Sequence, residues 1–364
     1  MKVNHSVLFE KVGKCMAVLG KGSTNPFNFF EICKLNNKTY VGSANSQMVV
    51  LTPLGFDFPE CKIPGEFYQL LQKLKAEELD LDIKDNFLLL RSKNSVTELV
   101  LVNKKFSVTN LLGVEKAPVW KDLPSNFCEC LSMCGSCTSI TEEKTDYVYF
   151  DKQTCVATNK FEVISAELTS EMQKMFVRGI FSKTVSYYKP IQFDIFDEAN
   201  WNVYRCEDDT VLFVRTLKAQ EKYPLITNKE EYTDEELSRK KSFIVDNLFN
   251  VNGSILKLPD KSVVENLVKS CKIFSAKTIG EEMEQITVKI GNNYLQLEAQ
   301  GILGRHKVRT AYPESNGVQL SFSIHPQLFM DILTNGSECV VGERAIVVKT
   351  DNFKHWILLN KRGA

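Results

Sequence analysis

Apolar residues recur at helical spacing in three well-separated segments of the chain, residues 5–19, 123–137 and 261–274. In each segment apolar positions three or four residues apart form one stripe, and polar residues fill the opposite side. The pattern predicts three amphipathic helices. Because they are spaced along the whole chain, each is expected to open one structural unit.

A second pattern occurs twice, once near each end of the chain. The run IPGEFYQLL (residues 63–71) matches HPQLFMDIL (residues 325–333) in its Pro, its Phe and its last two aliphatic residues. Downstream, LLLRSKN (residues 88–94) matches IVVKTDN (residues 346–352) position by position in residue type. Each copy predicts a Pro-capped amphipathic helix followed by a hairpin. The copies lie about 260 residues apart, which indicates two repeats of about 130 residues.

The middle of the chain supplies a third, looser copy. Residues 178–188 (RGIFSKTVSYY) have a short helical pattern, and WNVYR (residues 201–205) and TVLFVRTL (residues 210–217) predict paired strands around an acidic turn. We therefore predict an α+β chain of three repeated domains, each with two helices packed on antiparallel sheets. The expected bounds are residues 1–118, 119–225 and 226–364, with a charged linker at residues 226–257.

Residues 229–241 (KEEYTDEELSRKK) are the most highly charged part of that linker. A solvated linker or surface helix is the ordinary interpretation. A partner-docking segment is the alternative.

The composition is that of a globular protein, with 43% apolar and 25% charged residues among 364. No apolar run approaches the roughly 18 residues of a membrane span, and the N-terminal pattern predicts no signal peptide. We expect a cytoplasmic protein without a membrane partner. The 45 Lys and Arg balance 45 Asp and Glu, which argues against a uniformly basic nucleic-acid binder but allows segregated charge.

Four of the eleven cysteines cluster in CECLSMCGSC: Cys128, Cys130, Cys134 and Cys137. Zinc binding and redox chemistry both use closely spaced cysteines. However, all four lie within ten residues of one helical pattern, where small thiols pack well. Core packing is the favoured interpretation, with a zinc-binding protein as the alternative.

Sequence signatures of catalysis are missing. The four His residues have no metal-protease spacing, and the chain contains no nucleophile elbow, phosphate-binding loop or dinucleotide fingerprint. We expect neither an enzyme nor a cofactor.

The order of these segments resembles the bacterial β sliding clamp, the processivity subunit of DNA polymerase III, over nearly the full length. The carriers of the resemblance are residues 5–19 with IPGEFYQLLQKL, then DDTVLFVRTLKAQEKYP (residues 208–224), then FSIHPQLFMDIL through IVVKTDNF to HWILLNKRGA (residues 322–364). Two places depart from the family. Leu359 and Asn360 stand where it commonly has Met-Pro, and residues 158–161 (TNKF) replace its Asp-Gly-His-Arg-like turn. These departures fit a divergent clamp of bacterial or viral origin.

The resemblance implies a homodimeric ring that encircles duplex DNA without sequence preference. It also implies a replicative polymerase and a clamp loader as partners, and helices lining the hole. A clamp-like scaffold or regulator of replication or repair is the alternative function. Cations on the expected helices outnumber acids, so we predict phosphate contacts, although helices are often rich in lysine in any case. The predicted contacts are Lys11, Lys14, Lys21, Lys73, Lys75, Lys174, Arg178, Lys183, Lys269 and Lys272.

Two further sites follow from the resemblance. The dimer interface would use Leu99 in one domain and Ile273 with Phe274 in another. The partner-peptide pocket would use Thr158, Lys160, Phe161, Val163, Ile357, Leu359 and Asn360. For Ile273, Phe274, Ile357 and Leu359, a place in the ordinary core is the alternative interpretation.

Overall fold

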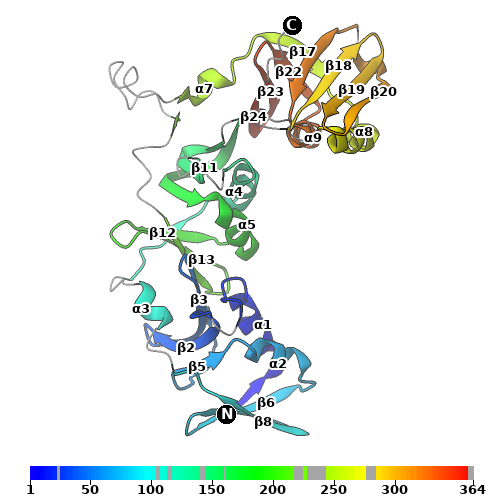
Figure 1. Cartoon of the computed structure of the whole chain (residues 1–364). Helices are drawn as coiled ribbons and strands as arrows, with labels where there is room; N and C mark the ends of the chain where they lie inside the picture. The colour runs from blue at the N-terminus through cyan, green and yellow to red at the C-terminus, as the bar shows by residue number, and fades with distance from the viewer. Residues whose placement is uncertain are drawn as a thin grey trace. The chain divides into compact units, whose positions relative to one another are not determined.

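A computed structural model describes residues 1–22, 25–103, 107–112, 117–139, 145–159, 161–216, 224–227, 243–275, 284–315 and 317–359. The charged segment at residues 229–241 lies outside these stretches. The chain forms two compact units, Met1–Glu129 with Met175–Ala219 and Cys130–Lys174 with Gln220–Ala364. We describe each unit by itself (Figure 1).

The first unit contains two antiparallel sheets. The larger has eight strands in the order β5 (Cys61–Pro64), β2 (Phe29–Leu35), β3 (Lys38–Ala44), β4 (Met48–Pro53), β14 (Val211–Arg215), β13 (Trp201–Arg205), β12 (Gln192–Phe196) and β9 (Lys121–Asp122). The smaller has four strands in the order β1 (Lys2–Asn4), β6 (Glu78–Lys84), β7 (Phe87–Ser92) and β8 (Ser95–Val100). In the larger sheet, β4 pairs with β14 and so joins the predicted first and second domains.

Short helices pack on these sheets. They are α1 (His5–Cys15), α2 (Phe67–Lys73), α3 (Val108–Leu112) and α5 (Gly179–Tyr188), and α4 (Phe127–Gly135) begins in this unit. The side chain of Asn4 accepts a hydrogen bond from the amide of Val7 and caps α1. Leu8, Val12 and Cys15 then face the core at helical spacing.

The second unit repeats the arrangement. A six-stranded sheet has the order β10 (Tyr147–Thr158), β11 (Glu162–Arg178), β24 (Phe353–Leu358), β23 (Ala345–Thr350), β22 (Glu338–Gly342) and β17 (Gly253–Lys257). A four-stranded antiparallel sheet has the order β20 (Gly304–Ala311), β19 (Tyr294–Gly301), β18 (Ile286–Gly291) and β21 (Leu320–Ile324). The remaining elements are the short pair β15 (Leu225–Ile226) and β16 (Phe243–Ile244), the helices α7 (Val245–Leu248), α8 (Lys261–Phe274) and α9 (Pro326–Asn335), and the 3-10 turn η3 (Pro313–Ser315).

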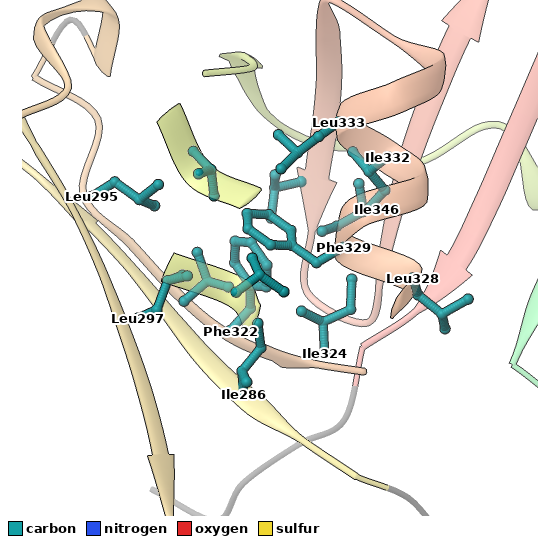
Figure 2. Packing of buried hydrophobic residues seen from close by; sticks show 14 of the residues in the cluster. Ile286, Leu295, Leu297, Phe322, Ile324, Leu328, Phe329, Ile332, Leu333 and Ile346 are labelled. Carbon is teal, nitrogen blue, oxygen red and sulfur yellow. The ribbon is translucent and has the colours of Figure 1, made fainter. Parts of the chain in front are cut away.

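Helices α8 and α9 lie side by side in this unit (Figure 1). Figure 2 shows the core beneath them, where Phe329 of α9 lies against Phe322 of β21 and Ile332 of α9 lies beside Ile346 of β23. Full burial of each such side chain contributes about 1.5–3 kcal/mol relative to exposure. This core fixes the helices on one face of the sheets and leaves the other helix face to solvent.

The predicted elements are largely confirmed. Helix α8 has the predicted bounds, β13 coincides with WNVYR, and Pro326 lies at the start of α9 as expected. The predicted Pro cap of the first copy is wrong, because Pro64 ends β5 and α2 begins only at Phe67. Pro64 is tolerated there because β5 is an edge strand.

In the described part of the chain, no helix is both long enough and apolar enough to cross a membrane.

Candidate functional site

Most of the predicted DNA-contacting cations have exposed side chains, namely Lys21, Lys73, Lys75, Lys174, Lys183, Lys269 and Lys272. Lys183 lies on α5, and Lys269 and Lys272 lie on α8, outside the buried stripe of that helix. Lys269 also forms an ion pair with Glu265 at 2.7 Å, one turn earlier. Such an exposed pair is weak, so the lysine remains available to a phosphate.

Lys11 and Lys14 are half-buried and engaged within the first unit. The Lys11 ammonium donates to the carbonyl oxygen of Pro53 at 2.5 Å. The Lys14 ammonium lies 2.6 Å from Asp208 and 3.1 Å from Glu10. Burial lowers the pKa of Lys14, but its hydrogen bonds to these two carboxylates outweigh burial and raise the pKa. Both lysines are therefore less free for phosphates than their helical positions predict.

Lys174 and Arg178 do not lie on a helix, which corrects the prediction. Both belong to the long strand β11, and Arg178 ends it in the extended conformation that precedes α5. The Arg178 guanidinium lies 3.5 Å from the side-chain oxygen of Gln47 and 5.8 Å from the ring centre of Phe181. The neighbouring Met175, Phe176 and Val177 are all buried. Three consecutive apolar residues lack the alternation of a half-buried strand, and the sequence pattern was therefore interpreted as helical.

The residues predicted for the dimer interface lie at the end of a helix in the second unit and on an edge strand in the first unit. Ile273 at the end of α8 is 61% exposed, while Phe274 is half-buried and stacks on His306 with ring centres 5.1 Å apart. Leu99 is half-buried on β8, an edge strand. Its neighbours Val96 and Val100 are 65% and 58% exposed.

A second edge strand, β20, was missed by the sequence analysis. Strand β20 is the outermost strand of its four-stranded sheet, and the side chains of Arg305, Lys307 and Arg309 on it are exposed to solvent. The spacing of two in GRHKVRTA was the signal, since alternate residues of a strand share one face.

The two segments predicted for the peptide pocket lie side by side in the second unit. Strands β11 and β24 pair antiparallel with Val163 opposite Trp356, and the amide of Leu358 donates to the carbonyl of Phe161 at 2.8 Å. Thr158 and Val163 are buried, and the Thr158 hydroxyl donates to the carbonyl of Glu162 at 2.8 Å.

Burial divides the remaining pocket residues. Ile357 is 0% and Leu359 6% exposed, and both belong to the core beneath α8 and α9, which supports the core interpretation for them. Phe161 is half-buried against that core and keeps an exposed part. Lys160 and Asn360 lie outside the described residues.

The turn that presents Phe161 is held by a network of polar groups. The side-chain oxygen of Asn159 accepts from the amides of Phe161 and Glu162, at 2.8 and 2.9 Å, and its amide group donates to Glu162 at 2.7 Å. The other Glu162 oxygen lies 2.8 Å from Nε2 of His355 on β24. Sequence analysis did not find this network, because no local spacing connects residues so far apart.

Three of the four clustered cysteines pack in the core, and Cys128 is half-buried. Cys134 and Cys137 are fully buried, and Cys130 is 3% exposed. Their thiols approach separate backbone carbonyls, those of Glu167, Cys155 and Ala157, at 3.6–3.7 Å. Burial raises the pKa of Cys137 well above its ordinary value, which disfavours the thiolate that a metal requires. Among the described residues, no group of three ligating side chains converges as a metal site.

Comparisons with known proteins define the class of fold. No protein-family model and no curated protein matches the sequence. Solved structures, in contrast, match from end to end, and they are sliding clamps of bacterial DNA polymerase III. The chain therefore has the three-domain α+β fold of the sliding clamps.

Three of these structures set the level of similarity. The DNA polymerase III subunit beta of Pseudomonas aeruginosa has a TM-score of 0.76 at 11% identity, with 100% of each chain covered. The DNA polymerase III beta chain of Streptococcus pneumoniae has a TM-score of 0.73 at 14% identity, with 99% of each chain covered. The DNA polymerase sliding clamp of Bacillus subtilis has a TM-score of 0.73 at 11% identity, and the match covers 100% of this chain and 99% of the Bacillus chain.

Proposed function

We propose that this chain is a DNA sliding clamp, a non-catalytic subunit without a cofactor that encircles duplex DNA and tethers a replicative polymerase. The observation that carries the proposal is the end-to-end likeness to clamp structures at TM-scores of 0.73–0.76. The domain bounds we propose are 1–118, 119–225 and 226–364.

DNA is held by topology and by weak, uniform attraction. Exposed lysines such as Lys183, Lys269 and Lys272 supply positive charge on α5 and α8. Phosphate contacts carry no base information, so a ring can slide while it stays bound. Lys11 and Lys14 act less directly, because their ammonium groups are already hydrogen-bonded within the protein.

Two copies close the ring head to tail, with the first domain of one copy against the third domain of the other. Exposed Ile273 and half-buried Leu99 are on the surfaces that would meet. Val96 and Val100, on the same edge strand as Leu99, are exposed as well, and a group of exposed apolar side chains supports a partner there.

The polymerase and the clamp loader bind through short peptides near the β11–β24 pair. Phe161 supplies a partly exposed aromatic surface, and the core that includes Ile357 and Leu359 supports it from beneath. Thr158 and Val163, on the neighbouring strands, are buried. Lys160 and Asn360 complete the proposed pocket. We place the protein in the cytoplasm of a bacterium, or of the host cell if a virus encodes it.

Retention on circular DNA tests the proposal. Dilute protein is concentrated in the presence of nicked circular plasmid, so that rings close around it, and the complex is isolated by gel filtration. The plasmid is then cut once. Protein should stay on the circle and leave the linear form, because only a free end releases a ring. Equal retention on both forms contradicts a sliding clamp. Retention on circles without stimulation of the cognate polymerase identifies a clamp-like scaffold instead.

A further inference from the structure

Tyr187 on α5 is an aromatic side chain that the protein leaves in solvent. It is 73% exposed, whereas the next most exposed aromatic side chain in the described part of the chain, Phe87, is 37% exposed. Phe87 has a cross-strand neighbour, because it lies opposite Val100 in the β7–β8 ladder. Tyrosine combines a large apolar ring with a polar end and is enriched where proteins meet their partners. The exposure of Tyr187 therefore indicates a contact that the isolated chain does not make.

The solvent face of α5 combines this ring with positive charge. The buried residues of the helix, from Gly179 to Tyr188, form one stripe. Ile180, Lys183 and Tyr187 are exposed and lie three and four residues apart, so they share a face outside that stripe. Lys189, directly after the helix, is exposed as well.

Tyr188 supports the Tyr187 ring from within the protein. The Tyr188 hydroxyl donates to the backbone carbonyl of Lys14 in the last turn of α1, and its side chain is buried. The two tyrosine rings lie T-shaped, with their centres 5.4 Å apart. The helix ends at Tyr188, because Lys189 adopts the left-handed backbone conformation with φ 50° and ψ 58°. Tyr187 thus stands on the last turn of α5, supported by a fixed neighbour and largely open to solvent.

The chemistry of this face fits a nucleotide better than a protein partner. Lys183 separates Ile180 from Tyr187, so the face lacks the continuous apolar patch that marks a protein interface. An aromatic ring beside cations is, in contrast, the arrangement by which proteins hold single-stranded nucleic acid. The bases stack on the ring, and the phosphates meet the cations. Paired bases already stack on one another inside a duplex, so only unpaired bases can use such a ring.

We propose that Tyr187 is a stacking platform for unpaired bases of DNA, with Lys183 and Lys189 as contacts for the adjoining phosphates. The substrate of this platform is single-stranded DNA, such as a template strand where it leaves the duplex. The inference rests on the proposed clamp function, because that function places α5 beside DNA. It goes beyond that function, since lysine contacts to phosphates do not distinguish paired from unpaired strands.

Three substitutions at Tyr187 separate stacking from other kinds of contact. Fluorescence anisotropy measures binding of the full chain to dye-labelled oligothymidylate and to a fully paired hairpin duplex at low salt. Tyr187→Ala and Tyr187→Leu should each weaken binding to oligothymidylate about tenfold, because neither side chain can stack on a base. Tyr187→Phe should bind oligothymidylate as tightly as the wild type, since the ring remains. All three variants should keep the wild-type affinity for the duplex.

Two further variants serve as controls. Lys183→Gln should weaken binding to both kinds of DNA, because phosphates are present in both. Val263→Ala shortens a 51% exposed apolar side chain on α8 and should change neither affinity. Circular dichroism checks that each exposed substitution leaves the fold intact.

Several results would overturn the stacking platform. Wild-type affinity in Tyr187→Leu would mean that any apolar side chain suffices. A loss in Tyr187→Phe equal to that in Tyr187→Ala would assign the contact to the hydroxyl group. Equal losses on oligothymidylate and duplex, or a wild type that stays on circular DNA without binding oligothymidylate, would also contradict the proposal.

Failure of the proposed function gives a different result. A wild type that binds oligothymidylate through Tyr187, but is retained equally on circular and linear plasmid, has the platform without being a sliding clamp. A wild type that stays only on circles, with Tyr187 variants unchanged on oligothymidylate, is a clamp without the platform.

Discussion

Nε2 of His355 lies 2.8 Å from the Glu162 carboxylate, with both side chains more than nine-tenths buried. Glu162 faces Ile357 and His355 faces Ile164 in the β11–β24 ladder, so the pair crosses the ladder diagonally. Nδ1 of His355 is buried and has no hydrogen-bond partner in the described chain. Glu162 is thus the polar contact that compensates the buried ring.

Loss of either member of this pair should destabilise the second unit. Removing one partner of a buried hydrogen bond leaves the other group unsatisfied, which costs about 1–3 kcal/mol, so His355→Ala and Glu162→Ala should each lower the free energy of unfolding by roughly that amount. Urea unfolding measures both variants and the double variant. The coupling energy should be about 1–3 kcal/mol. Strictly additive losses would show that the pair does not act as a unit.

Lys14 should control the ionisation of Asp208. Burial raises the pKa of Asp208, but its hydrogen bonds to Lys14 and Thr210 outweigh burial and lower the pKa below the ordinary 3.8. A lowered carboxyl pKa stabilises the fold above the unfolded value, and this stabilisation is lost as the pH falls through the folded value. Lys14→Met should raise the pKa of Asp208 in a carboxyl NMR titration.

Asp209 supplies the internal control for that titration. Its pKa is lowered by Arg205 first and by Lys38 as well, so Lys14→Met should leave it unchanged. An unmoved Asp208, or an equal shift of Asp209, would contradict the assignment.

The exposed helix lysines should contribute collectively to DNA binding. Lys183→Gln, Lys269→Gln and Lys272→Gln together should lower the slope of the salt dependence of DNA binding by up to about 6, because a ring of two copies loses all three lysines from each copy and each phosphate contact contributes roughly one unit. The loss should be the same for all DNA sequences. Binding is measured on nicked circles between low and high salt.

A triple variant with the same charge change is the matched control for these lysines. Lys84, Lys349 and Lys354 are exposed and lie on or beside strands. Their replacement by Gln should leave the slope unchanged. An equal effect of both triples would mean that overall charge, not helix position, governs binding.

Phe161 should be an anchor for partner peptides. Phe161→Ala removes a half-buried aromatic surface and should weaken stimulation of the cognate polymerase by about tenfold or more, while the dimer persists. Val119→Ala, at a 60% exposed position, should have no effect. Deletion from residue 359 onward is a poorer test, because buried Leu359 belongs to the core and its amide donates to Arg344. Full stimulation by the Phe161 variant would place the partner site elsewhere.

Local pattern predicted the elements well where one face of each is buried. Helix α8 follows a regular stripe of Val264, Val268 and Cys271, and its bounds are those expected. Pattern failed at Lys174, because β11 is buried on both sides near its end and lost the alternation of a strand. The apolar pattern also could not show whether Ile357 lines a peptide groove or lies in the core, since both places require an apolar residue.

Long-range contacts were beyond the sequence. Glu162 and His355 are separated by 193 residues, and nothing near either one indicates the other. Asp208, similarly, appears in the sequence as part of an acidic turn, and only the fold places it beside Lys14 of another predicted domain.

The ladder between β4 and β14 changes what counts as a building block in this chain. Met48–Leu51 pairs with Val211–Val214, and every side chain in that seam is at most 9% exposed. A fragment ending at residue 118 would carry β4 with a bare, wholly apolar edge, and a fragment starting at residue 119 would carry β14 in the same condition. Such edges favour aggregation. Shuffling or truncating single repeats would therefore cut through a sheet, and the smallest portable piece of this protein spans more than one repeat.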